Sequence, residues 1–337
     1  DPGRGASPRI FQTKECWSDC RQNAVNGNGT FLFFNQWMVG DSPLHKASHS
    51  KLQTGRGMWL KLSLPILICI TAFMLYPFFY SIILSLYTHK GLNATFVGFG
   101  NYVKMFKDPT FVKALGNNFL FLIIQVPIML ILGLFFAYIL QTDNLKFKGF
   151  FRMAIFLPCV TSLVAYSLVF RTMFQVDGLV NRILMNLHIV SAPLPWLNER
   201  GWARTLVIIA LCWRWTGYNT MYYIAGLQNI PRDIMEAARI DGCNSVQAFF
   251  KVIVPQLKQV IVFTSVTSTI GTLQLFDEIT MLTKGGPGNS TLTASYYIFK
   301  QSFELNNNYG YSAAMSWVIV LIIAVLSVFQ LKATKED

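Results

Sequence analysis

Charged residues are scarce in this chain. Of its 337 residues only 13% are Asp, Glu, Lys or Arg, while 53% are hydrophobic. Soluble domains carry about 25% charged residues, so the deficit favours a membrane protein over a water-soluble one. The net charge is +12, but Lys and Arg are scattered and flank apolar runs. That pattern is typical of contact with anionic lipid headgroups, so we expect a lipid bilayer and no nucleic acid as a partner.

Motifs that carry chemistry are also missing. No Gly-x4-Gly-Lys-Ser/Thr phosphate-binding loop occurs, which excludes an ATPase within this polypeptide. No His-Glu-x-x-His is present, and the four histidines lie far apart in sequence. Cys16 and Cys20 lack the second pair that a zinc site needs, and the other four cysteines lie in apolar runs or in one polar loop. We therefore expect no catalytic residue, no metal and no cofactor, and predict a protein that is not an enzyme.

Residues 1–57 differ from the rest because they mix small polar residues with scattered charge and show no sustained periodicity. We expect a largely disordered N-terminal extension. The chain begins with Asp1 rather than Met, which fits a fragment, or an extension ahead of a start at Met38 or Met58.

Residues 58–337 predict one all-α integral membrane domain with six transmembrane helices. Each apolar run is long enough to cross a hydrocarbon core of about 30 Å. An even number of spans places both chain ends on the same side, and Lys and Arg are slightly enriched on the side of these ends. The expected spans are 62–87, 119–140, 151–173, 203–225, 260–282 and 310–331.

A polar loop, 226–259, joins the expected fourth and fifth spans. Pro231-Arg232-Asp233 is a favourable helix start, because Pro suits the first helical position and Asp suits the positive end of the helix dipole. Gly242 stops or bends this helix, and a second helical stretch ends at Pro255. A short amphipathic helix of this kind suits docking into a groove on a soluble partner.

The same loop resembles the signature loop of ATP-binding-cassette importer permeases, written Glu-Ala-Ala-x3-Gly-x9-Ile-x-Leu-Pro. Glu236, Ala237, Ala238, Gly242 and Pro255 match it, and Val252 and Val254 replace the Ile and Leu. The wider string from Ile230 to Gly242 resembles the carbohydrate-import branch, as do segments 88–118, 174–202 and 284–291. The resemblance covers about residues 59–331.

This resemblance implies one permease subunit of a sugar importer, multi-pass in the plasma or inner membrane, with the signature loop and both termini cytoplasmic. The implied partners are a second permease subunit (a heterodimer), an ABC ATPase dimer, an extracytoplasmic solute-binding protein and a sugar or oligosaccharide. The implied mechanism is that closure of the ATPase dimer rocks the membrane helices. The implied ATPase-coupling residues are Glu236, Ala237, Ala238, Asp241, Gly242 and Pro255.

Polar and aromatic residues inside the fourth and fifth spans predict a substrate path, because aromatic faces and hydrogen-bonding groups together suit carbohydrates. The same residue types also serve helix packing and interfacial belts, so this alternative stays open. We expect Asp277 and Glu278 to be interfacial. The candidates for the path are Tyr218, Asn219, Tyr222, Thr267 and Gln274.

Two other functions compete with the importer. A secondary transporter or half-transporter driven by an ion gradient needs ionisable residues at mid-membrane, and the sequence reading finds only Arg171 and Asp277, both near span ends. A non-transport scaffold leaves the signature loop without a purpose. The importer is therefore favoured.

Overall fold

The structure is a computed structural model, and it describes residues 63–90, 93–142, 145–231, 233–234, 236, 240, 242–305 and 307–335. The expected N-terminal extension, 1–57, lies outside this part. The chain divides into two compact units, residues 1–76 and 77–337. The described part of the first unit is helical and exposed, and it includes a π-helical segment, Thr71–Leu75.

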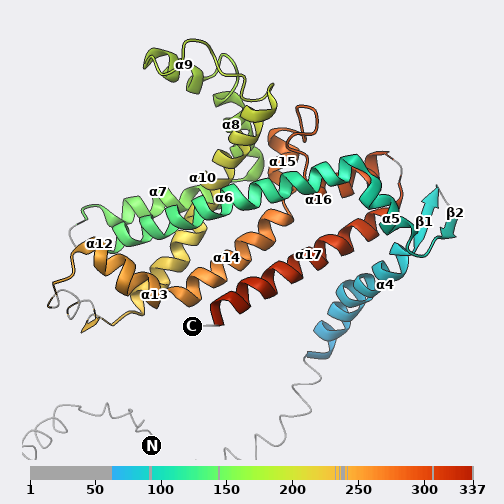
Figure 1. The fold of residues 1–337 in the computed structure, drawn as a ribbon, viewed down its shortest axis with the longest axis horizontal. Helices are drawn as coiled ribbons and strands as arrows, with labels where there is room; N and C mark the ends of the chain where they lie inside the picture. Colours follow the sequence, from blue (N-terminus) through green and yellow to red (C-terminus); the bar gives the residue numbers. More distant parts are fainter. Residues whose placement is uncertain are drawn as a thin grey trace, which may run out of the picture. The chain divides into compact units, whose positions relative to one another are not determined.

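Helices dominate the second unit (Figure 1). After α4 (Tyr76–Ser85) comes a small antiparallel hairpin of β1 (Tyr87–Lys90) and β2 (Asn93–Phe96), in which Tyr87 pairs with Phe96. Asn308 fixes the hairpin to the start of the last helix, because its side chain accepts from the His89 amide at 3.1 Å and donates to Thr88 Oγ1 at 2.9 Å. The expectation of an all-α fold is therefore corrected at residues 87–96, where Thr and aromatic residues favour strands.

Three long helices form the frame of this unit: α6 (Pro109–Gln141), α10 (Arg200–Gln228) and α17 (Tyr309–Lys335). The expected second span begins at 119, but α6 begins ten residues earlier because Asp108 caps it. The Asp108 carboxylate accepts from the Thr110 and Phe111 amides at 2.9 and 3.4 Å, and Pro109 occupies the first position. α6 packs along α10, and Gly133 allows close approach to Tyr223.

Asp108 also joins three helices. Its Oδ2 accepts from the hydroxyls of Tyr297 in α16 (Ala294–Phe299), at 2.6 Å, and of Tyr311 in α17, at 3.0 Å. Burial alone raises the pKa of the Asp108 carboxyl. The hydrogen bonds from the two tyrosines and two backbone amides together outweigh burial and hold this pKa below its ordinary 3.8.

Two of the expected spans are broken. Span 151–173 is two helices, α7 (Lys148–Val160) and α8 (Leu163–Met173), which meet at 100°. Span 260–282 ends early, because α14 (Lys258–Leu273) stops before a separate α15 (Asp277–Leu282). Ahead of α14, residues 246–256 form a bent partner at 71°, built from α12 (Ser245–Ala248), the π-helical Phe249–Ile253 and α13 (Val254–Gln256). The remaining elements are α5 (Gly100–Lys107), α9 (Leu179–Asn186) and the π-helical Lys300–Leu305.

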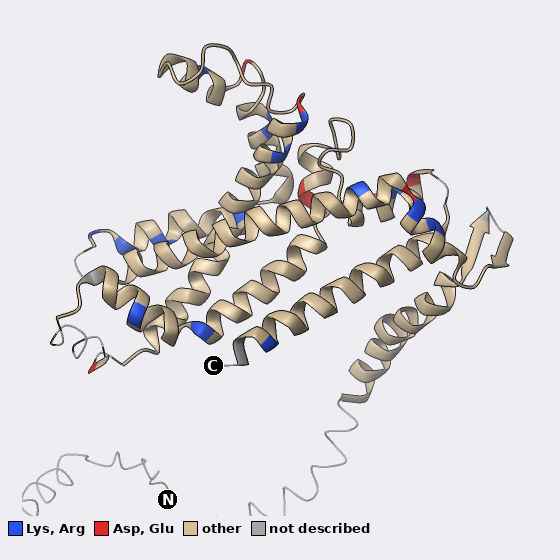
Figure 2. Cartoon of the chain, viewed as in Figure 1, with Lys and Arg blue, Asp and Glu red and all other residues tan. Residues whose placement is uncertain are grey.

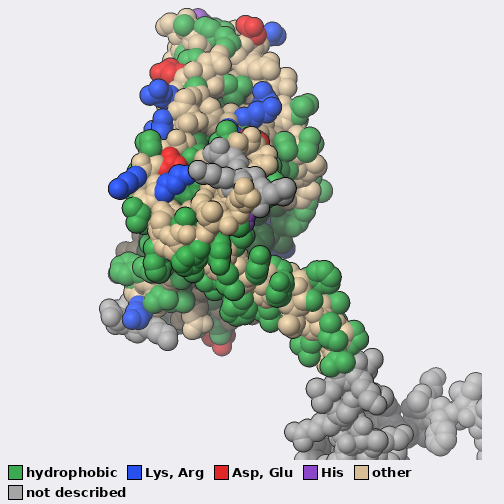
Figure 3. Space-filling model, turned by 90° about the vertical axis from the view of Figure 1, so that its right-hand side faces the viewer, with side chains coloured by type: hydrophobic (Ala, Val, Ile, Leu, Met, Phe, Trp, Pro, Cys, Tyr) green, Lys and Arg blue, Asp and Glu red, His purple; other side chains and the backbone are tan. Residues whose placement is uncertain are grey.

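Within the described residues, three helices are long and apolar enough to cross a membrane: Ser63–Ser85, Pro109–Gln141 and Tyr309–Ala333. The number rises to five if each bent pair is one span. Charged residues lie mostly in loops and near helix ends (Figure 2). Hydrophobic side chains gather into broad patches on the face drawn in Figure 3. Large exposed apolar patches mark surfaces that contact something other than water, so the fold is that of a multi-pass membrane protein.

Candidate functional site

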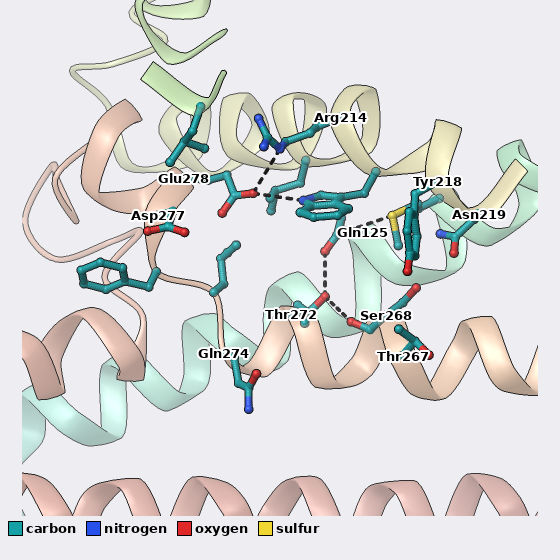
Figure 4. A pocket seen from close by; sticks show the side chains of 17 residues that line it. Gln125, Arg214, Tyr218, Asn219, Thr267, Ser268, Thr272, Gln274, Asp277 and Glu278 are labelled. Carbon is teal, nitrogen blue, oxygen red and sulfur yellow. Dashed lines mark hydrogen bonds and ion pairs between the residues drawn. The ribbon is translucent and has the colours of Figure 1, made fainter. Parts of the chain in front are cut away.

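A cavity of about 520 Å³ lies where α6, α10 and α14 meet the segment 274–278 (Figure 4). Its lining combines amides, hydroxyls, aromatic rings and three charged side chains. The lining residues are Gln125, Met129, Leu163, Leu211, Arg214, Trp215, Tyr218, Asn219, Thr267, Ser268, Gly271, Thr272, Gln274, Leu275, Phe276, Asp277 and Glu278.

One wall joins α6 to α14 through uncharged polar groups. Thr272 Oγ1 lies 3.2 Å from Gln125 Oε1 and 2.8 Å from the Ser268 carbonyl oxygen. The Gln125 amide nitrogen also lies 3.4 Å from the sulfur of Met129 (Figure 4). Gln125 is buried, so this wall places an amide and a hydroxyl deep beside the cavity.

A second wall is aromatic. Trp215, Tyr218 and Tyr222 lie at spacings of three and four residues, which places them on one face of α10. Their ring centroids are 6.0 Å apart for the first pair and 5.0 Å apart for the second, both edge to face. The hydroxyls of Tyr218 and Tyr222 are 2.8 Å apart, and Tyr222 packs on Phe263 of α14 at 5.2 Å. The wall thus offers apolar ring faces together with hydroxyl groups.

An ion pair between a half-buried arginine and a buried glutamate closes one end of the cavity. Arg214 lies at the midpoint of α10, fourteen residues from either end. Its Nε lies 3.9 Å from Glu278 Oε1, and the two side chains are 13% and 7% exposed. Trp215 Nε1 donates to the same oxygen at 3.0 Å. An Arg214 Nη nitrogen donates to the Thr161 carbonyl, at the break between α7 and α8, at 3.3 Å.

This pair corrects two expectations. Glu278 is buried rather than interfacial, whereas its neighbour Asp277 is exposed. Arg214 is an ionisable residue in the middle of a long helix, which the sequence reading overlooked when it named only Arg171 and Asp277. An arginine between two tryptophans in an apolar run is a visible signal, because charges inside such runs are costly and are retained for a purpose. Burial of Glu278 depends on a partner 64 residues away and has no local signal.

Asn118 fixes the rim of the cavity. Its side chain is fully buried, and its Nδ2 donates to the Thr272 and Leu273 carbonyls at 3.3 and 2.9 Å. Its Oδ1 accepts from the Ala294 amide at 2.9 Å. One amide side chain of α6 therefore holds both the end of α14 and the start of α16, with the cavity-lining segment 274–278 between them.

Asn117, the preceding residue, holds the loop that follows α15. Its Nδ2 donates to the Asn289 and Leu292 carbonyls at 3.0 and 2.8 Å. Arg204 of α10 donates to Asn117 Oδ1 and to the Ser290 carbonyl, both at 2.9 Å. This loop, which includes the segment 284–291 that resembles the carbohydrate-import branch, is thus fixed to both α6 and α10.

The structure brings the candidate substrate-path residues together. Tyr218, Asn219, Thr267 and Gln274 line the cavity, and Tyr222 lies one turn along α10 from Tyr218. Contact with a substrate stays a prediction for all five. Sequence reasoning missed Gln125, although a glutamine inside an expected span is a signal of the same kind as Asn219. Among the described residues, no group of His, Cys, Asp or Glu side chains could hold a metal ion.

The candidate coupling residues are only partly described. Ala237, Ala238 and Asp241 lie outside the described residues. Glu236 is helical and exposed. Gly242 has φ +79°, a left-handed conformation that favours glycine, and a Cβ there would meet nothing within 4 Å. Pro255 is exposed within α13, directly before the 71° bend into α14.

The second helical stretch of this loop begins with a reciprocal cap. The Gln247 amide donates to Asn244 Oδ1 at 2.8 Å, and the Asn244 amide donates to Gln247 Oε1 at 3.0 Å. Two backbone donors that a helix start leaves unpaired are thereby satisfied. The sequence Asn244-Ser245-Val246-Gln247 carries this signal, which the sequence reading did not use.

Comparison with known proteins gives relatives along most of the chain. The family described as binding-protein-dependent transport system inner membrane component matches residues 96–331. The chain is 50% identical over 280 residues to the lactose transport system permease protein LacF of Rhizobium radiobacter, which covers 82% of this chain and 94% of the relative. It is 36% identical over 273 residues to the arabinooligosaccharides transport system permease protein AraP of Halalkalibacterium halodurans, covering 80% of this chain and 85% of the relative.

The fold also has a solved counterpart. A chain of a bacterial ABC transporter involved in the import of the acidic polysaccharide alginate superposes with a TM-score of 0.71. The match covers 86% of this chain and 98% of that one at 19% identity, so it shows the fold alone. With the family match over 96–331 and a relative that is half identical along nearly its whole length, the chain belongs to the family of inner-membrane components of binding-protein-dependent transport systems.

Proposed function

We propose that this chain is a permease subunit of an ATP-driven sugar importer and forms half of the path across the membrane. The cavity is the observation that carries the proposal, because amides, hydroxyls and aromatic ring faces together suit a carbohydrate. Family membership and two relatives named for lactose and arabinooligosaccharide transport support it. The chain carries no chemistry of its own in this proposal; ATP hydrolysis belongs to a separate subunit.

The proposed topology has six spans within residues 58–337. The five candidates counted above become six if α10 also crosses the membrane. Its 29 residues extend about 43 Å, which exceeds the hydrocarbon core, and the pairing of Arg214 removes the main objection to inserting it. Both termini then lie on the cytoplasmic side with the part of the loop 226–259 that precedes residue 246, on the plasma or inner membrane.

The proposed partners are a second permease, an ATPase dimer and an extracytoplasmic sugar-binding protein. The ATPase is proposed to contact the segment from Glu236 to Gly242. The route from this contact to the substrate is short in sequence: the loop passes through Pro255 and bends into α14, and α14 places Thr267 and Thr272 on the cavity. A movement of the loop that tilts α14 therefore moves one wall of the cavity.

An ion-gradient transporter is the alternative function. The half-buried Arg214 means that a lack of mid-membrane ionisable residues no longer argues against it. Its guanidinium, however, lies against Glu278 and the Thr161 carbonyl, which gives it a structural role. Membership of a binding-protein-dependent family also supports an energy source in another subunit, so the importer stays the better proposal.

The test is sugar uptake and sugar-stimulated ATP hydrolysis in proteoliposomes that hold the complete complex, assembled with the neighbouring permease, ATPase and binding protein. Gly242→Asp should abolish both, because the side chain enters a left-handed turn and adds a charge at the proposed contact. Gly149→Asp is the matched control: it adds the same side chain at another exposed glycine with open space around it. Uptake and hydrolysis that survive in the Gly242 variant would remove the coupling role, and a wild-type complex that moves no sugar would remove the importer.

A further inference from the structure

We infer that the cavity accepts saccharides without an anionic group and rejects those that carry a carboxylate or a phosphate. The inference rests on the proposed sugar transport and adds to it the charge class of the substrate. It follows from which charged side chains line the cavity and from which of them are already paired.

Only three of the lining residues are charged: Arg214, Asp277 and Glu278. Formally they contribute one positive and two negative charges. The other polar lining residues are uncharged amides and hydroxyls, which are Gln125, Tyr218, Asn219, Thr267, Ser268, Thr272 and Gln274. The cavity therefore has an excess negative charge, although the whole chain carries a net charge of +12.

The positive charge is balanced by a carboxylate of the protein itself. The Arg214 guanidinium lies 3.9 Å from Glu278 and donates to the Thr161 carbonyl. It also lies over the rings of Tyr166 and Trp215, at 5.3 and 5.6 Å from their centroids. Its side chain is 13% exposed, and in Figure 4 it points toward Glu278. A ligand anion that approached the guanidinium, whose Nε makes no hydrogen bond, would also approach the Glu278 carboxylate and be repelled by it.

The unpaired charge is on Asp277. In the described part of the chain this residue makes no ion pair, and its side chain is exposed at the edge of the cavity. A carboxylate can accept hydrogen bonds from sugar hydroxyls, so it suits a neutral saccharide. Toward a second anion it is repulsive, and a protein cavity screens that repulsion less than water does. Placing a like charge against the unwanted ligand is a common source of specificity.

The fold itself does not set this preference. The superposed transporter, involved in the import of an acidic polysaccharide, has the same fold at 19% identity. Function resides in the side chains of a site rather than in the fold. A difference in charge preference between the two proteins is therefore compatible with their similarity.

The experiment measures binding to the purified complex of both permeases and the ATPase, without the binding protein, so that the selectivity of the binding protein does not contribute. The probes are neutral di- and trisaccharides that include lactose and arabinotriose, followed by a C6-carboxylate analogue of the tightest-binding probe that has a C6 hydroxyl. Isothermal titration calorimetry gives the dissociation constants. We expect the carboxylate analogue to bind at least about tenfold more weakly than the neutral sugar. The ratio of the two dissociation constants should decrease at high salt, because screening shortens the range of the repulsion.

Asp277→Asn tests the source of the selectivity. It should tighten binding of the carboxylate analogue severalfold relative to binding of the neutral sugar, so that the ratio of the two dissociation constants approaches one. Asp177→Asn is the matched control, because it removes the same charge at an exposed position outside the cavity. The inferred charge preference is overturned, and the proposed sugar function is not, if the two sugars bind equally or if the ratio of their dissociation constants is unchanged in the Asp277 variant. Binding of no saccharide in the set overturns the proposed sugar function as well.

Discussion

Asn118 is the residue whose replacement tests the architecture of the cavity most directly. Replacing it with Ala removes three hydrogen bonds at a fully buried position. The Thr272 carbonyl keeps the Leu275 amide as a donor at 3.4 Å. The Leu273 carbonyl and the Ala294 amide lose the Asn118 side chain as their partner.

The magnitude follows from these two groups. An unsatisfied buried polar group costs about 1–3 kcal/mol, so the loss of both should destabilise the fold by about 3 kcal/mol. For a domain of 150–250 residues a change of 1 kcal/mol shifts the melting temperature by about 2–4 °C. Because this chain is larger, each kcal/mol shifts its melting temperature less, so we expect a decrease of about 5 °C. Asn118→Asp should be at least as damaging, because it keeps the acceptor but loses both donors and buries a charge.

The assay is thermal unfolding in detergent, followed by intrinsic fluorescence. Asn186→Ala is the matched control, since Asn186 is exposed at the end of α9, and it should stay within about 1 °C of the wild type. A melting temperature for Asn118→Ala equal to that of the control would refute the view that one amide holds the rim.

Three further predictions concern other contacts. Gly217→Ala should lower the melting temperature and the yield, because its Cβ would clash with the Ile155 carbonyl oxygen and force α7 away from α10. Arg214→Gln should destabilise the protein by about 3–5 kcal/mol, and adding Glu278→Gln should restore part of this loss, because the single variant leaves a buried carboxylate without its cation. Asp108→Asn should lower the melting temperature above pH 4. The difference in melting temperature between this variant and the wild type should become smaller as pH falls below 3.8. A carboxyl whose pKa is lowered on folding loses its stabilising effect once it is protonated.

Each of these has a result that would count against it. Gly116→Ala is the control for Gly217→Ala. It lies at an exposed helical position where a Cβ would meet nothing within 4 Å, so it should be tolerated. An equal decrease in melting temperature for both variants would mean that the close contact between α7 and α10 is not the cause. Strictly additive losses for Arg214 and Glu278 would mean that the two are not coupled. If the difference in melting temperature between wild type and Asp108→Asn does not change with pH, the charge of the Asp108 carboxylate does not contribute to stability.

Local patterns in the sequence predicted the long apolar helices well. The runs around 119–140 and 310–331 correspond to α6 and α17. A continuous apolar stretch of this length favours a helix, because a helix pairs every backbone polar group within the segment. The turn at Gly242 followed from the freedom of glycine at positive φ. The family could be recognised because its signature residues lie close together in one loop, and the match over 96–331 confirms that recognition.

Features that depend on distant partners could not be read in the same way. The break between α7 and α8 has no local cause that the sequence reading identified, since Pro158 lies inside α7 rather than at the break. The end of α14 depends on Asn118, which comes about 150 residues earlier. Burial of Glu278 depends on Arg214. The cavity depends on the α7–α8 break, the end of α14 and this ion pair together. Hydropathy along one segment contains none of this information.

The contact between Arg214 and the Thr161 carbonyl has a consequence for how the protein is made. Residues 148–173 leave the ribosome before residue 214, so the bend between α7 and α8 is synthesised before its hydrogen-bond donor exists. In the proposed topology the bend lies in hydrocarbon, which supplies no water to satisfy that carbonyl in the meantime. The bent pair therefore reaches its final form only after α10 arrives. The Cys159 thiol lies 2.9 Å from the Arg214 carbonyl oxygen. In chains whose other cysteines are replaced, it should accordingly react with maleimide in mild detergent, where water reaches the thiol, when the chain ends before α10, and be protected when the chain includes α10. Equal reactivity in both would show that the bend forms without α10.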